Sequence, residues 1–415
     1  MTQSETVKND PARAVRIAGC LLGGAVGDAL GGAIEFTPLE RIRQRFGPEG
    51  VTGFEDYCKA GIRGVGLITD DTQMTLFTAE GLLRGYAQQR EKGTGNIPTA
   101  IYRAYLRWLD TQGEDSGLEG KNDGWLFQVS DLHACRAPGN TCLSALESDR
   151  MGTVEEPINN SKGCGGVMRA APVGLATFVD DPFKLGMEAA AITHGHPTGY
   201  LTAGCLAQVI HDLVEGNMLV GALNHAISIL QEYPDHKETL SSLRHAIQLW
   251  EEDRGEGATP ERVEQLGQGW VAEEALAIGV YCALAAGADF ATGIRLAVNH
   301  SGDSDSTGSI AGNILGALLG KNAIPGEWLS QLELREVIEE IANDLSTGFQ
   351  ESPDGQISIR VGRGNQINEV PKTRSGICWE PLRATSSDRF MKAIISRRQI
   401  SRSFLRAAAL PTIRF

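Results

Sequence analysis

The sequence lacks the features that mark strand-rich, disulfide-bonded or zinc-finger proteins. Aromatic residues make up only 6% of the chain, and long runs of alternating polar and apolar residues, which are typical of strands, are missing. The eight cysteines occur singly, without a CxxC pair or finger-like spacing. This usage predicts reduced thiols in the cytoplasm.

Signals for membrane insertion or export are scarce as well. The start, "MTQSETVKNDPARAVR", lacks the apolar segment of a signal peptide. The small-residue run "GCLLGGAVGDALGGAI" is interrupted by Asp28, and "ALAIGVYCALAAGA" is too short to cross a bilayer. We therefore expect no membrane partner.

Positive charge is in short supply over most of the chain, whose net charge is −14. Residues 351–415 hold 12 Lys and Arg and 5 Asp and Glu, so the preceding part holds 26 basic and 47 acidic residues. Phosphate attraction dominates nucleic-acid affinity, and an acidic body therefore argues against a nucleic-acid partner. It does not exclude a small anionic ligand held by local backbone N–H groups.

What the sequence does contain is a series of segments whose apolar residues recur at threes and fours, which predicts an all-α fold. We expect a polar lead over 1–13, one helical domain over 14–350 and a basic C-terminal appendage over 351–415, since termini of this kind are often poorly ordered. The expected helices cover 12–34, 71–89, 98–110, 182–194, 199–215, 218–231, 239–251, 272–286, 290–299, 305–319 and 327–347.

Two pairs of aspartates stand at expected helix starts. "LITDDTQMTLF" (67–77) places Asp70 and Asp71 between threonines, and "NHSGDSDSTGSIAGN" (299–313) places Asp303 and Asp305 among serines. Either pair alone is explained by helix capping. Four converging carboxylates would repel one another unless a cation joined them, and oxygen ligands favour Mg²⁺, Mn²⁺ or Ca²⁺ over Zn²⁺. The residues alone leave both interpretations open.

Six motifs in order resemble the ADP-ribosylglycohydrolase family, which includes ADP-ribosyl-arginine and ADP-ribosyl-serine hydrolases and dinitrogenase reductase-activating glycohydrolases. The motifs are "GCLLGGAVGDALGGAIEF" (19–36), "TDDTQMTL" (69–76), "KGCGGVMRAAPVGL" (162–175), "THGHP" (193–197), "GWVAEEALAIGVYCAL" (269–284) and "NHSGDSDSTGSIAGN" (299–313). The resemblance implies an all-α bundle with two Mg²⁺ ions in a central cleft, Mn²⁺ being the alternative. It also implies ADP-ribose or an ADP-ribosylated protein as the partner.

The resemblance assigns the metal to two groups of oxygen-bearing side chains: Thr69, Asp70, Asp71, Asp303, Asp305 and Ser306. Thr307 replaces Ser306 if the register slips by one residue. Glu35 matches a glutamate that reaches the metal or its water in relatives, although the motif alone does not exclude a solvated glutamate at a helix end. The expected catalytic carboxylates are Glu35, Asp71 and Asp303.

The loop "SKGCGGVMR" resembles the segment that holds the distal ribose and diphosphate in the family. Glycine-rich backbone can form an anion-binding nest of N–H groups. The residues assigned to substrate are Ser161, Lys162, Gly163, Cys164, Gly165, Gly166 and His194. Cys164 departs from the family because relatives often carry Asn there, and no activating partner for a reactive thiol is evident nearby. We expect "RAPGNTCLSAL" (136–146) to be a turn that lines the cleft.

The implied reaction is hydrolysis of the bond between the anomeric carbon of ADP-ribose and an acceptor, such as an arginine side chain. One alternative is hydrolysis of another ADP-ribosyl or ribosyl glycoside. Another is a non-catalytic ADP-ribose binder or a structural protein built on the same fold. The presence of all six oxygen-bearing side chains at the metal positions favours an enzyme.

Overall fold

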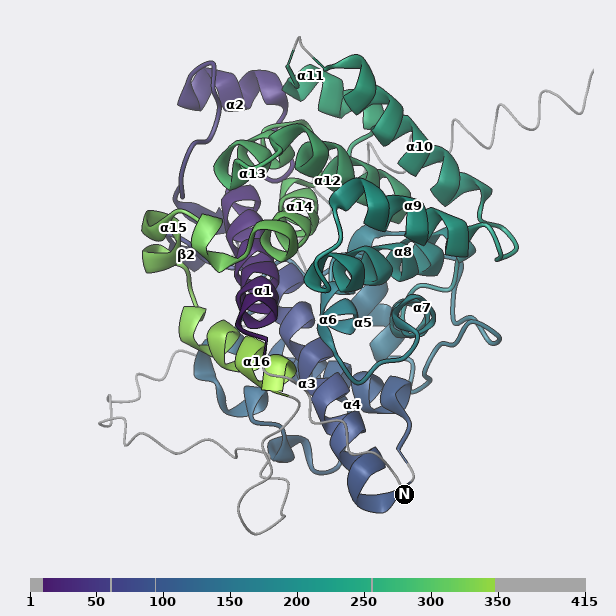
Figure 1. Cartoon of the computed structure of the whole chain (residues 1–415). Coiled ribbons are helices and arrows are strands. Elements are labelled where there is room, and N and C mark those ends of the chain that lie inside the picture. The colour runs from purple at the N-terminus through teal and green to yellow at the C-terminus, as the bar shows by residue number, and fades with distance from the viewer. Residues whose placement is uncertain (1–9, 60–61, 94, 255–256, 348–415) are drawn as a thin grey trace, which may run out of the picture. The chain divides into compact units, whose positions relative to one another are not determined.

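The computed structural model describes residues 10–59, 62–93, 95–254 and 257–347 (Figure 1). Within these residues the strands are limited to one antiparallel hairpin, β1 (Tyr57–Lys59) and β2 (Ile62–Gly64). The predicted all-α fold is therefore confirmed. The predicted appendage, 351–415, and most of the predicted lead, 1–13, lie outside the described residues.

Sixteen α-helices are present in the described part of the chain. They are α1 (Pro11–Gly32), α2 (Leu39–Phe46), α3 (Asp70–Lys92), α4 (Ile97–Thr111), α5 (Asn140–Leu146), α6 (Ala171–Leu175), α7 (Pro182–Ala191), α8 (Pro197–Val214), α9 (Leu219–Leu230), α10 (Lys237–Glu252), α11 (Pro260–Val263), α12 (Ala272–Ala286), α13 (Phe290–Val298), α14 (Ser304–Leu319), α15 (Gly326–Gln331) and α16 (Arg335–Thr347).

The helix expected over 327–347 is divided into two helices in the structure. The segment 327–347 contains α15 except for its first residue and all of α16, and Leu334 between them has a positive φ of 55°. A residue in that conformation cannot continue a right-handed helix. The pattern of apolar residues continues across the break, which is why the sequence reads as one helix.

Glycines bring α1 and α14 into backbone contact. The two helices pack antiparallel, so the C-terminal half of α1 lies beside the N-terminus of α14. A Cβ added at Gly23 would lie 2.4 Å from the Gly312 carbonyl oxygen, and one added at Gly27 would lie 2.0 Å from the Gly308 oxygen. No side chain fits at these positions. The close approach puts the C-terminal half of α1, with Asp28, against the N-terminus of α14, with Asp303 and Asp305.

The same helix corrects the expectation about membrane spans. By length and composition α1 is apolar enough to cross a bilayer, in spite of Asp28. Its most apolar window is 78% buried inside the folded chain, as the central helix of a globular core also would be. Its hydropathy is therefore accounted for by packing against α14 and its neighbours.

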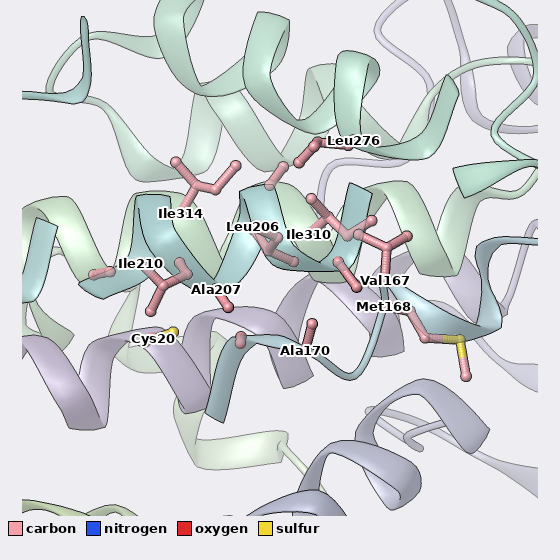
Figure 2. Close-up of a cluster of buried hydrophobic side chains, with 14 of the residues drawn as sticks. Cys20, Val167, Met168, Ala170, Leu206, Ala207, Ile210, Leu276, Ile310 and Ile314 are labelled. Carbon is pink, nitrogen blue, oxygen red and sulfur yellow. The ribbon is translucent and has the colours of Figure 1, made fainter. Parts of the chain in front are cut away.

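The core anchors the loop that precedes α6. Figure 2 shows Cys20 of α1, Leu206 and Ile210 of α8, and Ile310 and Ile314 of α14 in one cluster of buried side chains. Residues 167–170 contribute Val167, Met168 and Ala170 to the same cluster. Because these residues are buried, the glycine-rich turn just before them is fixed against the bundle.

Candidate active site

Each acidic cluster includes or adjoins a helix N-cap, which partly bears out the simpler interpretation. Thr69 is the N-cap of α3, and its hydroxyl accepts a hydrogen bond from the Asp71 N–H at 3.3 Å. Asp303 is the N-cap of α14 and accepts from the Ser306 N–H at 3.3 Å. Capping uses few of the available oxygen lone pairs, so it does not exclude a second role for the same residues.

The two helix starts open onto one cavity of about 350 Å³. Its lining includes ten of the residues singled out by sequence: Glu35, Asp70, Asp71, Gly163, Cys164, Gly165, His194, Asp303, Asp305 and Ser306. Glu35, Asp303 and Asp305 each offer a carboxylate oxygen, and these oxygens lie within 4.8 Å of one another. Residues far apart in the chain thus meet in one acidic site.

The electrostatics of the cavity are unfavourable without a counter-charge. Burial raises the pKa of Asp70, Asp71 and Asp303 well above the ordinary aspartate range, and the nearby charge of Asp305 raises each pKa further. Burying several carboxylates together disfavours their ionised forms. A divalent cation removes this penalty, so the cluster has the character of a metal site.

The donor atoms fit a hard cation. Asp71 is only 3% exposed, and its Oδ1 has no hydrogen-bond partner among the residues that the structure describes, although buried carboxylate oxygens are normally satisfied. Oxygen donors of this kind suit Mg²⁺ or Mn²⁺. The Thr307 hydroxyl, 2.8 Å from the backbone oxygens of Asp303 and Ala297, is engaged inside the bundle. This geometry favours Ser306, which lines the cavity, over Thr307.

Asp28 supports the first cluster, although no role was predicted for it from the sequence. This fully buried carboxylate of α1 accepts hydrogen bonds from the Thr69 N–H at 3.0 Å and the Thr72 N–H at 3.1 Å, and from the Thr72 hydroxyl. Burial, followed by the charge of Asp305, raises the pKa of Asp28 to about 7. Asp28 therefore fixes the α3 N-terminus. Thr69 itself does not line the cavity and contacts it through Asp71.

The glycine-rich loop differs in part from the expected anion nest. Gly163, Cys164 and Gly165 line the cavity, whereas Ser161 and Gly166 do not. The Gly163 N–H already donates to the Ser161 hydroxyl, and the Cys164 N–H donates to the Trp270 carbonyl oxygen. These two N–H groups serve to hold the loop.

Lys162 is also directed elsewhere. Its ammonium group pairs with Glu238 of α10 at 2.6 Å and with Glu273 of α12, and Lys162 is not part of the cavity lining. The side chain joins the loop to these helices instead of extending toward the cavity. The sequence could not reveal this because neither glutamate is near Lys162 in the chain.

Cys164 contacts the second cluster directly. Its thiol donates to Asp303 Oδ2 at 2.9 Å. Burial and the adjacent Asp303 raise the pKa of the thiol well above its ordinary value. A protonated thiol is a poor nucleophile. Cys164 therefore acts here as a hydrogen-bond donor to a candidate metal ligand.

His194 lies under the glycine-rich loop as a neutral imidazole. Arg169 donates to the Thr193 hydroxyl at 2.6 Å, and that hydroxyl lies 2.8 Å from His194 Nδ1. The hydroxyl hydrogen is thus given to Nδ1, which leaves the ring hydrogen on Nε2. Burial, and then the positive charge of Arg169, lowers the pKa of His194 to about 3. The ring is a hydrogen-bond donor to the cavity at physiological pH.

This pKa predicts a specific pH dependence of stability. The unfolded chain protonates His194 near pH 6.5, whereas the folded chain keeps it neutral down to about pH 3. Unfolding is therefore favoured as the pH falls through this window. Between pH 7 and 4.5 the wild type should lose about 2–3 kcal/mol more unfolding free energy than His194→Asn. Urea unfolding of both proteins without added metal measures the difference, and equal losses would contradict the buried neutral imidazole.

Two aromatic side chains at the cavity were not anticipated. Phe36 and Trp270 both line it, and their rings stack with centroids 4.8 Å apart and an interplanar angle of 17°. The sequence assigns no role to either ring, because the two residues lie far apart in the chain and only the fold brings them together. Residues 137–142 line the cavity, as expected for part of 136–146. The expected turn is wrong beyond residue 139, because 140–146 forms helix α5.

Known proteins similar to this chain belong to the family that the six motifs resemble. The family model described as ADP-ribosylglycohydrolase matches residues 9–355. The ADP-ribosyl-[dinitrogen reductase] glycohydrolase of Rhodospirillum rubrum is 26% identical over 326 residues, covering 77% of this chain and 91% of that protein. The ADP-ribosylarginine hydrolase Tri1 of Pseudomonas putida is 27% identical over 358 residues, covering 83% and 81%. A solved "ADP-ribosylglycohydrolase-related protein complex" matches with a TM-score of 0.56 and 28% identity, covering 82% of this chain and all of that one.

Proposed function

The chain belongs to the ADP-ribosylglycohydrolase family, enzymes that hydrolyse ADP-ribosyl glycosidic bonds, and we propose that it releases ADP-ribose from arginine side chains of a modified protein with the help of Mg²⁺. The observation that carries the metal requirement is the buried acidic cavity, in which three carboxyl pKa values are raised and Asp71 Oδ1 has no hydrogen-bond partner within the described part of the chain. The similarity to an ADP-ribosylarginine hydrolase supports arginine as the acceptor.

The proposed metal ligands are the oxygen-bearing side chains of the two helix starts that line the cavity: Asp70, Asp71, Asp303, Asp305 and Ser306. Thr69, the sixth residue of the predicted set, does not line the cavity, and we propose that its hydroxyl holds Asp71 in place. Two Mg²⁺ ions held there would bind ribose hydroxyls and lower the pKa of a nearby water. Mn²⁺ satisfies the same donor set.

The chain's own groups then supply proton transfer and orientation. Glu35 belongs to neither helix start and is less buried than Asp71 or Asp303. We therefore assign to Glu35 the proton that leaves water, and to Asp71 and Asp303 the stabilisation of an oxocarbenium-like transition state. His194 donates its Nε2 hydrogen to the substrate, and the loop 163–165 forms the adjacent wall. The proposed compartment is the cytoplasm, where the free thiols of the described cysteines remain reduced.

The decisive experiment measures hydrolysis of an ADP-ribosylarginine peptide by the full chain, stripped of metal by a chelator and then resupplied with Mg²⁺. We expect the stripped protein to lose on the order of 100-fold in turnover and Mg²⁺ to restore it, because an unshielded carboxylate cluster cannot position water or ribose. An ADP-ribosylserine peptide tests the acceptor in parallel.

The alternatives give different results in the same assay. Chelator-resistant turnover would exclude the metal role. ADP-ribose binding without hydrolysis of either peptide would indicate a non-catalytic binder. Hydrolysis of the serine peptide alone would replace arginine by an alcohol acceptor.

A further inference from the structure

The stacked Phe36 and Trp270 rings form a surface with two unusual properties. Phe36 keeps 65% of its surface exposed, whereas Phe is among the residue types most often fully buried. Its φ is +66°, a conformation that is strained for a residue with a bulky side chain. Strain of this kind persists only where the surrounding structure imposes it, and it concentrates at functional sites.

The backbone around the pair is tied to both halves of the site. The Phe36 N–H donates to the Gly302 carbonyl oxygen at 3.2 Å, directly before Asp303. The Trp270 carbonyl oxygen accepts from the Cys164 N–H at 3.2 Å, and the indole N–H donates to Gln268 at 3.2 Å. The backbone of Phe36, which directly follows Glu35, is thus tied to the residue before Asp303. The backbone of Trp270 is tied to Cys164, whose thiol donates to Asp303.

This location decides between two planar groups of the substrate. The diphosphate and second ribose separate adenine from the reacting anomeric carbon, so adenine belongs away from the carboxylates. The acceptor group, in contrast, is bonded to that carbon. A guanidinium is planar, stacks on aromatic faces and is attracted by neighbouring negative charge. A planar cation can therefore stack on the Phe36–Trp270 rings. Glu35, which directly precedes Phe36, supplies a neighbouring negative charge.

We propose that the Phe36–Trp270 pair is the acceptor platform of the enzyme, on which the guanidinium of an ADP-ribosylated arginine lies while its bond to ADP-ribose is hydrolysed. The inference rests on the proposed function and deepens it. Phe36 and Trp270 are specificity-determining residues in this assignment, distinct from the groups that bind metal or move the proton.

The experiment compares Phe36→Leu, which keeps apolar bulk but removes the π face, with Phe36→Tyr, which keeps that face. Phe178→Leu is the matched control, since Phe178 stacks on Tyr86 with centroids 4.0 Å apart and lines no part of the site. KM is measured for ADP-ribosylarginine and ADP-ribosylserine peptides. Agmatine, a small guanidinium compound, is titrated calorimetrically into each Mg²⁺-loaded protein in the presence of ADP-ribose.

We expect Phe36→Leu to raise the ratio of the KM for the arginine peptide to the KM for the serine peptide by about two- to five-fold. The affinity for agmatine should fall by the same factor. Phe36→Tyr and Phe178→Leu should keep the wild-type ratio. An unchanged ratio and agmatine affinity in Phe36→Leu would overturn the platform. Equal rises for both peptides, with weaker ADP-ribose binding, would overturn it in favour of a contact to the nucleotide. If the wild type hydrolyses neither peptide, the proposed function fails, and the agmatine titration alone then decides whether a guanidinium platform exists.

Discussion

Replacing Asp303 by Asn should reduce turnover on the order of 100-fold while the protein stays folded. Asn keeps the shape of the side chain and an oxygen that accepts from the Ser306 N–H, now 3.3 Å from Asp303 Oδ1. It removes one negative charge from a cavity proposed to bind divalent cations, so Mg²⁺ affinity and turnover fall together. Excess Mg²⁺ should recover part of the rate.

The stability of this variant separates capping from metal binding. Asn and Asp are comparable N-caps, and burial and Asp305 already raise the pKa of Asp303 well above its ordinary value. Without metal, Asp303→Asn should therefore unfold at the same temperature as the wild type or higher. Mg²⁺ should raise the unfolding temperature of the wild type more than that of the variant, because a ligand stabilises a protein in proportion to its binding to the folded state.

Asp289→Asn provides the matched control for this substitution. Asp289 is the N-cap of α13 and accepts from the Thr292 N–H at 3.1 Å, as a cap without other duties would. It should alter neither turnover nor the stabilisation by Mg²⁺. If Asp303→Asn were fully active without added metal, the metal role would be contradicted, and both aspartate pairs would serve only to stabilise the helix N-termini.

Helix periodicity was sufficient for most of the fold because α1, α3 and α14 each bury a continuous set of small or apolar residues. It was insufficient where conformation depends on a single residue. The positive φ of Leu334, which divides α15 from α16, leaves no trace in the spacing of apolar residues. The short helices α2, α5, α6 and α11 span too few turns for a period to be recognised.

The site shows the same division between local pattern and tertiary contact. Paired aspartates among hydroxyls have a local signature, and the structure brings Asp70, Asp71, Asp303 and Asp305 to one cavity. The direction of Lys162 depends on glutamates 76 and 111 residues away in the chain. The stack of Phe36 on Trp270 is equally non-local. Asp28 did carry a signal, since an acid inside an apolar helix is costly to bury without partners.

Replacing Asp28 by Ala should lower both stability and turnover, although Asp28 does not line the cavity. The change leaves the buried N–H groups of Thr69 and Thr72 and the Thr72 hydroxyl without their acceptor. Each unsatisfied buried group costs about 1–3 kcal/mol. Part of that cost is offset, because the substitution also removes a buried carboxyl whose pKa is raised to about 7 and which is itself unfavourable to bury. A net loss of about 2–4 kcal/mol in unfolding free energy is expected from urea titration.

The effect on turnover follows from position and not from charge. Asp28 fixes the residue that caps α3, and a shift of about 1 Å in Asp70 and Asp71 is enough to cost on the order of 100-fold in rate. Asp28→Asn, which retains one acceptor oxygen, should fall between the wild type and Asp28→Ala. Asp212→Ala is the control, because this buried carboxylate of α8 accepts from Gln208 at 3.0 Å and lies outside the cavity lining. It should lose stability while keeping the wild-type Mg²⁺ affinity measured by calorimetry. If Asp28→Ala, once folded, also kept that affinity and the full rate, the α3 N-terminus would not depend on Asp28, and the site would be organised by its own ligands alone.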